Sequence, residues 1–348
     1  MTPSFTVRPH RGRGARYLAA ALLALTLLAT GCGGSGGGPA RSATAPSDTT
    51  TAKARTDAVG RFASPNPGSV NMYWIPAPQG LILLDSLRTT TDARHAVDRI
   101  RNTGRPVVAI LISHSHPDHV GGLGVLHAAF PAAPIYASIG TTKTMRQDPR
   151  GFYPLTRAVP HSDFPPRLTY PDHVFRSGQT LDIGGLRLET AEFTAGESDF
   201  ATVYHDPATG ALYAGDLAGD RVTPALLEGH SCGWLVDIGT LLRRFPSART
   251  FYPGHGAPGD SHLLLDQQRT YLLRFRALVG AATAPHSPAG SVVDAKEKAS
   301  IERTMNHDYP GYPQVASLPD LLSLNIASVA KELTARGSQP TPAACHAI

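Results

Sequence analysis

The chain has 348 residues, with 32 lysines and arginines against 27 acidic residues and a formal net charge of +5. Residues 1–31 contain four arginines and no acidic residue, so the rest of the chain carries a net charge of only +1. Because the basic excess is concentrated in this short segment, the charge does not indicate a nucleic-acid partner, and we predict none.

The first 31 residues have the parts of a secretory signal. Arginines precede an apolar run, Tyr17–Leu28, which is followed by Ala29-Thr30-Gly31-Cys32. A basic region, an apolar region and small residues at the end are typical of a signal peptide, and the apolar run is too short for a permanent transmembrane helix. The Gly31-Cys32 junction resembles a bacterial lipoprotein signal, in which Cys32 is lipidated, although Ala29 stands where leucine is usual. The alternative is an ordinary secretory signal.

Residues 32–60 are rich in glycine, serine and threonine, and they predict a flexible linker. We therefore expect an exported protein, lipid-anchored on the outer face of the cytoplasmic membrane or the cell surface, and otherwise secreted. Membrane contact is expected only through the lipid at Cys32. In an oxidising compartment Cys232 and Cys345 are left as a pair, and a disulfide between them and two free thiols are equally good expectations.

Short apolar runs alternate with amphipathic stretches from residue 61 to residue 260, which indicates a layered α/β domain. The predicted strands are Val70–Trp74, Leu81–Asp85, Val107–Ser113, Arg187–Ala191, Ala201–His205, Ala211–Gly215 and Thr250–Tyr252. The predicted helices are Thr91–Asn102, Gly122–Ala129, Gly140–Arg146 and Trp234–Phe245. Residues 261–348 predict a helical C-terminal extension, with helices at Ser261–Leu278, Val293–Asn306 and Leu318–Arg336.

A histidine-rich segment, His114-Ser115-His116-Pro117-Asp118-His119, directly follows the apolar strand Val107–Ser113. Three imidazoles and a carboxylate within six residues are costly to bury unless a cation organises them. At the end of a strand His114 and His116 project to the same side, and a turn at Pro117 aims Asp118 and His119 elsewhere. One segment can therefore serve two metal ions. The alternative is a histidine-rich surface loop.

This segment resembles the H-x-H-x-D-H signature of the metallo-β-lactamase fold superfamily. Two further segments resemble that superfamily in the same order. The segment Ala211–Leu217 is similar to its strand ending in Gly-Asp, and Thr250–Gly256 is similar to the segment with its last histidine. The resemblance covers residues 66–260, and it implies a four-layer αββα sandwich with the metal ions at one edge of the two sheets.

The sequence departs from the superfamily at one metal-ligand position. A histidine is usual between the first motif and the bridging aspartate, and the alignment places Glu197 there. Glutamate binds zinc at about the same distance as histidine, so we predict that Glu197 is a ligand. The alternative is that Glu197 is a solvated loop residue and the site is weakened or absent. Asp199 and His205 are weaker candidates for the same role.

The resemblance implies two metal ions with defined ligand sets. The first ion would be held by His114, His116 and Glu197. The second ion would be held by Asp118, His119 and His255, and Asp216 would bridge both ions. We predict two Zn²⁺ ions per chain. Because Glu197 replaces an imidazole by a hard oxygen ligand, iron or manganese is a possible substitute.

The implied activity is that of a metallo-hydrolase in which a metal-bound hydroxide attacks a small extracytoplasmic ester, lactone, amide or phosphodiester. Asp118 is the candidate catalytic residue, because it can orient the nucleophile or pass on its proton. The Pro-rich stretch from Gly151 to Pro171 is a candidate wall of the substrate pocket. His230 and Tyr252 are weaker candidates for facing it. The alternatives are an iron-dependent redox member of the same fold and a catalytically impaired, lipid-anchored binding protein. The oligomeric state is not predicted.

Overall fold

The computed structural model describes residues 58–283, 293–315, 318, 320–335 and 342–345. The predicted signal peptide, Cys32 and the predicted linker up to residue 57 lie outside the described residues. Among the helices within the described ranges, none has the length and apolar character needed to cross a bilayer.

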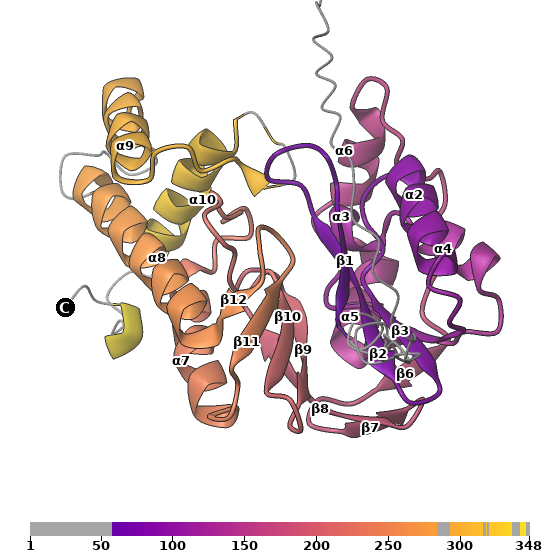
Figure 1. Cartoon of the computed structure of the whole chain (residues 1–348). Coiled ribbons are helices and arrows are strands. Elements are labelled where there is room, and N and C mark those ends of the chain that lie inside the picture. Colours follow the sequence, from indigo (N-terminus) through magenta and orange to yellow (C-terminus); the bar gives the residue numbers. More distant parts are fainter. Residues whose placement is uncertain (1–57, 284–292, 316–317, 319, 336–341, 346–348) are drawn as a thin grey trace, which may run out of the picture. The chain divides into compact units, whose positions relative to one another are not determined.

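Two six-stranded sheets form the centre of the described chain (Figure 1). The first sheet has the order β1 (Gly60–Ala63), β2 (Asn71–Ala77), β3 (Gly80–Leu84), β4 (Val107–Leu111), β5 (Ile135–Ser138) and β6 (His173–Phe175). The second sheet has the order β12 (Gly259–Asp260), β11 (Thr250–Pro253), β10 (Ala211–Gly215), β9 (Phe200–Asp206), β8 (Leu186–Thr194) and β7 (Thr180–Ile183). Both sheets are mixed, since β3 to β6 are parallel neighbours and β10 is parallel to β11.

Side chains alternate along each strand between two hydrophobic cores. In β3, Leu81 and Leu83 pack in the core beneath the outer helices, whereas Ile82 and Leu84 pack between the two sheets. This alternation with a period of two is expected of a strand whose two faces are both buried. The core between the sheets is completed by β10 and β9, for example by Tyr204.

Helices cover the outer face of each sheet, which gives four layers (Figure 1). The first sheet is flanked by α2 (Thr90–Arg101), α3 (Pro117–Val120), α4 (Leu123–Ala129), α5 (Ile139–Gln147) and α6 (Phe152–Ala158). The second sheet is covered by α7 (Ser231–Arg244) and α8 (Ser261–Thr283), against which α9 (Ala295–Asp308) and α10 (Leu321–Ala335) pack. The predicted αββα sandwich and helical C-terminal region are both confirmed.

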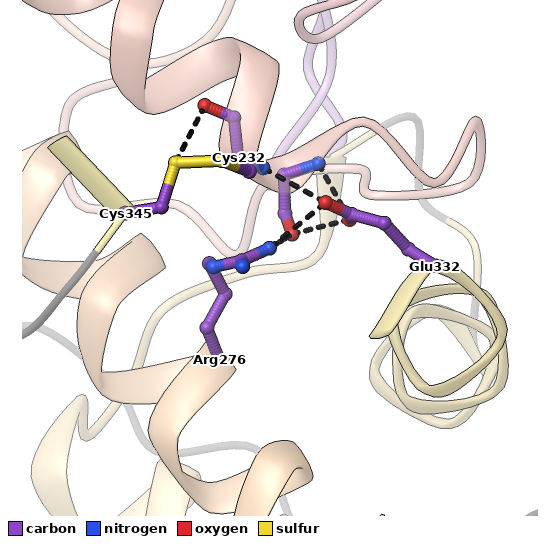
Figure 2. Close-up of a disulfide and its surroundings, with 5 residues drawn as sticks. Cys232, Arg276, Glu332 and Cys345 are labelled. Atoms are coloured by element: carbon purple, nitrogen blue, oxygen red, sulfur yellow. Dashed lines mark hydrogen bonds and ion pairs between the residues drawn. A yellow bond between two sulfur atoms is a disulfide. The ribbon is translucent and has the colours of Figure 1, made fainter. Parts of the chain in front are cut away.

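The C-terminal helices are joined to the sandwich by a disulfide between Cys232 of α7 and Cys345 of the 3₁₀ turn Ala343–Cys345 (Figure 2). Beside it, Glu332 of α10 accepts hydrogen bonds from the backbone N–H groups of Ser231 (2.8 Å) and Cys232 (3.1 Å). The carboxylate therefore caps the positive N-terminus of α7. Arg276 of α8 forms a buried ion pair with the same carboxylate at 2.9 Å.

The two sheets also meet at the edge where β4 and β11 end. Backbone Thr202 donates to the carbonyl of Ser113 (2.7 Å), and the Tyr204 hydroxyl donates to the carbonyl of Ile112 (2.8 Å). On the other side, backbone Asn71 donates to the carbonyl of Gly254 (2.6 Å). This edge is where the predicted metal-binding segments converge.

Candidate metal centre

The histidine-rich segment begins where β4 leaves the first sheet. His114 forms an isolated bridge with Ala201 of β9, so the segment is fastened to the second sheet. Pro117 then occupies the first turn of the short helix α3, a position that needs no backbone N–H. The helical turn directs Asp118 and His119 away from the extended residues before it. All four of the segment's candidate ligands, His114, His116, Asp118 and His119, are wholly or largely buried.

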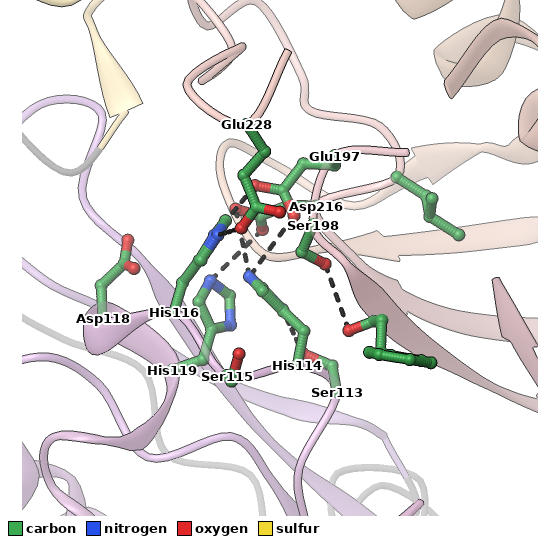
Figure 3. Close-up of polar contacts among 12 residues, drawn as sticks. Ser113, His114, Ser115, His116, Asp118, His119, Glu197, Ser198, Asp216 and Glu228 are labelled. Carbon is green, nitrogen blue, oxygen red and sulfur yellow. Dashed lines mark hydrogen bonds and ion pairs between the residues drawn. The ribbon is translucent and has the colours of Figure 1, made fainter. Parts of the chain in front are cut away.

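A first group of potential ligand atoms lies around Glu197 (Figure 3). His116 Nδ1 is 3.0 Å from Glu197 Oε1, and His114 Nε2 is 3.6 Å from Glu197 Oε2. Asp216, directly after β10, has its Oδ2 at 4.0 Å from His114 Nε2. Glu197 is itself buried. These four side chains are close enough to share one ion.

A second group lies on the other side of Asp216 and consists of Asp118, His119 and His255. His119 Nε2 is 3.4 Å from Asp216 Oδ1, and His255 Nε2 is 3.2 Å from Asp216 Oδ2. His255 Nε2 is also 3.3 Å from Asp118 Oδ2. Asp216 therefore stands between both groups, as expected of a bridging carboxylate.

Many of these buried polar atoms have no hydrogen-bond partner within the described part of the chain. They are the Nε2 atoms of His114, His119 and His255, both carboxylate oxygens of Glu197 and Oδ1 of Asp216. Each unsatisfied buried polar atom costs about 1–3 kcal/mol. Atoms that converge in this way without hydrogen bonds suit cations placed between them, so the residues present fit a metal centre.

The second ring nitrogen of each histidine has a hydrogen-bond partner. His119 Nδ1 contacts Asp85 Oδ2 at 2.8 Å, His255 Nδ1 contacts the carbonyl of Gly68 at 2.8 Å, and His114 Nδ1 contacts Ser113 Oγ at 3.0 Å. Asp85 also accepts hydrogen bonds from the backbone and hydroxyl of Ser113, each at 2.8 Å. These contacts fix the rings so that Nε2 faces the cluster, as the outer partners of metal-binding histidines do.

The His116 ring is turned the other way from these three rings, and a contact with Glu228 fixes its orientation. His116 Nε2 is 2.9 Å from Glu228 Oε1, which leaves Nδ1 facing Glu197. Arg150 lies 3.2 Å from Glu228 and 2.6 Å from Asp199. The carboxylates of Asp199 and Glu228 are therefore already paired with a cationic side chain, so this neighbouring acidic cluster is an ion-pair network that supports His116.

The charges of the cluster shift the pKa values of its members in opposite directions. Burial alone would lower the pKa of His255, but the Asp216 and Asp118 carboxylates outweigh it and raise the pKa to about 10. Burial would raise the pKa of Asp216, and His255 and His119 instead hold it well below its ordinary value. Burial raises the pKa of Glu197. Nearby Asp216 and Glu228 raise it further, and His116 lowers it by less than these effects together. Closely spaced carboxylates thus give the centre a strong preference for added positive charge.

A cavity of about 410 Å³ opens directly onto the cluster. Its lining includes His116, Asp118, Glu197, Asp216 and His255. The predicted pocket-wall stretch from Gly151 to Pro171 contributes to the lining through helix α6, which forms its first part.

His230 contacts Asp199 and Arg150, and Tyr252 stacks on Tyr213, so neither belongs to the cavity lining. Asp199 pairs with Arg150, and His205 contacts Glu189, so neither replaces Glu197 in the cluster.

The sequence interpretation missed Asp85 and Glu228. Asp85 directly follows the buried strand β3 at the same sheet edge as the histidine segment, and this position was an available signal. Its backbone has a φ of 61°, a conformation that non-glycine residues adopt at a cost and that is common at functional sites. Glu228 lies in an irregular segment before α7, and no local pattern identifies it.

A model of the metallo-beta-lactamase superfamily matches residues 65–296, more than half of the chain. The chain belongs to this superfamily. The match extends past the predicted domain boundary at residue 260, and that boundary stays a prediction.

Three relatives illustrate how this superfamily member compares with known proteins. A probable metallo-hydrolase of Streptococcus pyogenes is 26% identical over 193 residues, which cover 53% of this chain and 78% of the relative. An (R)-specific secondary-alkylsulfatase of Pseudomonas sp. is 44% identical over 54 residues, 15% of this chain and 8% of that protein. A crystal structure of a metallo-beta-lactamase family protein of Thermus thermophilus has a TM-score of 0.56 at 20% identity, with 80% of this chain and 92% of that chain covered. The structural likeness shows the fold.

Superfamily membership and the clustered histidines and carboxylates together support a metal-dependent hydrolase that binds divalent cations. The structure brings all seven predicted side chains together in the two groups. Their individual roles as ligands stay a prediction.

Proposed function

We propose that this protein is a hydrolase with a dinuclear metal centre that acts on a small ester, lactone, amide or phosphodiester. The observation that carries the proposal is the convergence of buried imidazole and carboxylate atoms without hydrogen-bond partners on both sides of Asp216. His114, His116 and Glu197 would hold one ion, and Asp118, His119 and His255 the other. Asp216 would contact both.

Charge balance supports two divalent ions in preference to one. The candidate ligand set contains three carboxylates, of which Asp118 and Glu197 are buried and Asp216 has a side chain only 9% exposed. One divalent ion would leave the cluster negative, whereas two ions offset all three charges. Zinc is the first choice for a mixed imidazole and carboxylate set, and iron or manganese is the alternative that the extra carboxylate favours.

When bound, two divalent ions would supply a water of pKa near 7 and would polarise the bond that is cleaved. The chain's own residues then position the reactants. His119 and His255 hold the pKa of Asp118 well below its ordinary value despite its burial. The ionised Asp118 carboxylate lines the cavity. There it would accept a hydrogen bond from the attacking water and orient it. The rest of the hydrolysis requires no serine or cysteine nucleophile.

The proposed setting of this activity is extracytoplasmic. The disulfide between Cys232 and Cys345 supports it, because disulfides persist mainly in oxidising compartments. The sequence pattern of residues 1–32 supports export with a lipid anchor at Cys32. A periplasmic or cell-surface location would restrict the substrate to small molecules that reach that compartment.

The decisive experiment is elemental analysis of the protein from residue 33 onward, beside Glu197→Ala and the control Glu302→Ala on α9. We expect two zinc ions per chain in the wild type and the control, and about one ion in Glu197→Ala. One ion in all three proteins would contradict the assignment of Glu197, and predominant iron would favour the redox alternative.

A screen of substrates completes the test of the proposed function. Lactones, carboxylic esters and phosphodiesters are the first classes, and a sulfate ester is added because one relative is named as an alkylsulfatase. Turnover should disappear with a chelator and return with zinc. Turnover that survives removal of the metal would overturn the proposal.

A further inference from the structure

The cavity beside the metal centre has a mostly apolar lining with a smaller polar part. Its polar lining consists of cluster residues, including Asp118 and Glu197, together with Arg88 and Thr156. Its apolar lining is supplied by three separate parts of the chain. These residues are Phe152, Leu155 and Val159 at α6, Ala225 and Leu227 before α7, and Val315, Leu318 and Leu324 near α10.

The apolar lining side chains range from buried to largely exposed. Val315 is only 4% exposed, whereas Leu155 is 65%, Val159 56% and Leu324 47% exposed. Large exposed apolar side chains gathered in one place commonly mark a binding site, whereas single ones need no explanation. Here they line the same cavity as the candidate catalytic residue, Asp118.

We propose that the substrate carries an extended apolar chain, an acyl or alkyl group of several carbons, on the bond that is hydrolysed. This inference rests on the proposed hydrolase function and names its substrate class. The ester group lies at the cluster while the chain lies between α6 and the side chains of Val315, Leu318 and Leu324. One water molecule adds across the ester bond, so one acid and one alcohol are released.

The cavity size and the source of its walls support this assignment. A volume of about 410 Å³ lies in the range of small-molecule sites, which combine mostly apolar walls with a few polar groups. Part of the wall comes from the C-terminal region, beyond residue 296 where the superfamily match ends. The apolar specificity is therefore partly a property of this chain's own C-terminal segment.

The first test compares hydrolysis of p-nitrophenyl acetate and p-nitrophenyl octanoate by the metal-loaded protein. Burial of the chain should raise kcat/KM for the octanoate at least about tenfold above that for the acetate. Leu155→Asn should reduce this ratio at least about threefold, since it places an amide along the chain. The control Leu263→Asn changes a leucine of α8 that is 56% exposed and outside the cavity lining, and it should keep the wild-type ratio.

A binding measurement separates this inference from the proposed function. Calorimetric titration of the metal-loaded protein with sodium acetate and sodium octanoate requires no turnover. Octanoate should bind at least about tenfold more tightly than acetate, and Leu155→Asn should lose most of that difference. Preferential binding without turnover would support the apolar site and contradict the hydrolase. Equal binding of both carboxylates, or an unchanged preference in Leu155→Asn, would overturn the apolar-chain proposal even if ester hydrolysis is found.

Discussion

Glu228 fixes the one histidine of the centre that presents Nδ1. Removing its carboxylate in Glu228→Ala would free the His116 ring, because Glu228 Oε1 is bonded to His116 Nε2. We expect zinc affinity to fall about 10- to 100-fold, the usual effect of losing an outer partner of a metal ligand. Competition with a chromophoric chelator measures it.

The control for Glu228 is Asp199→Asn, which removes another partner of Arg150 without touching His116. It should retain wild-type zinc affinity, and Glu228→Gln should recover part of the loss because its amide oxygen still accepts a hydrogen bond. Equal losses in Asp199→Asn and Glu228→Ala would indicate that the Arg150 network, and not the contact with His116, determines affinity.

Gly254 is required by the close approach of β11 to the metal centre. An ideal Cβ there would lie 1.9 Å from Asp216 Oδ1 and 2.7 Å from His119 Cε1. Gly254→Ala should therefore displace Asp216, reduce the metal content to one ion or fewer and lower activity about 100-fold.

The matched control for Gly254 is Gly239→Ala on α7, where the nearest atom is the flexible end of Arg243 at 3.4 Å. Elemental analysis and kcat/KM of both variants form the comparison. A fully loaded and active Gly254→Ala protein would show that the backbone can shift to accommodate the methyl group.

The residues of the centre differ in how far the sequence alone predicts them. The four candidate ligands from His114 to His119 lie in one local pattern, so their chemistry can be inferred without knowledge of the fold. Glu197 was placed only through the resemblance. Asp85 contacts His119 across 34 positions of sequence, and its place directly after β3 was the one signal for it. Glu228 contacts His116 across 112 positions, and no local pattern identifies it.

At the scale of elements, helix α7 contains a buried carboxyl group that raises the energy of the folded state at high pH. Asp237 Oδ2 has no hydrogen-bond partner among the residues that the structure describes, and desolvation raises the pKa of Asp237 to about 7. Between pH 4 and 7 the folded state keeps a proton that the unfolded state has lost, so the free energy of unfolding falls as pH rises.

Asp237→Asn should remove this penalty. We expect the variant to be more stable than the wild type at pH 8 by on the order of 1–2 kcal/mol, after allowance for partial solvation, with the difference shrinking toward pH 4. Urea denaturation of both proteins at pH 5 and pH 8 measures the difference. A stability gain of the same size at both pH values would indicate a packing effect instead.

The start of α7 and the presence of α6 depend on side-chain contacts that the local sequence pattern does not reveal. The helix was predicted from Trp234, whereas it begins at Ser231 because Glu332, a hundred residues later, binds its first N–H groups. The Pro-rich stretch from Gly151 to Pro171 was expected to be a wall of the pocket, and no helix was predicted in it. Its first part, Phe152–Ala158, forms α6 because Asp148 accepts hydrogen bonds from the backbone N–H groups at the start of that helix. The strands with strong apolar patterns, such as β3 and β10, were predicted closely.

At the scale of the whole molecule, the disulfide closes a span of 113 residues that includes α8, α9 and α10. Cys345→Ser should therefore lower the free energy of unfolding by about 2–4 kcal/mol, because the unfolded chain gains conformational freedom. Metal content should remain two ions per chain, since neither cysteine touches the ligand cluster. Urea denaturation with and without dithiothreitol provides the test.

The reductant is the internal control for this variant. Dithiothreitol should destabilise the wild type to the level of Cys345→Ser and should leave the variant unchanged. A wild-type protein whose stability does not respond to reduction would contradict the role of the bond. The sequence could not decide between the disulfide and two free thiols, because closing this span depends on how the C-terminal helices pack on the second sheet.

The candidate ligands come from both sheets, with the His114–His119 segment after β4 and Asp216 and His255 from the ends of β10 and β11. Ions bound at this edge would therefore couple the packing of the two sheets to the concentration of free metal. By mass action, a single ion at 1,000 times its dissociation constant adds about 4 kcal/mol to the stability of the folded state. A low concentration of free metal would thus have two effects. It would reduce the proposed catalytic activity, and it would increase the fraction of unfolded chains that proteases can cleave.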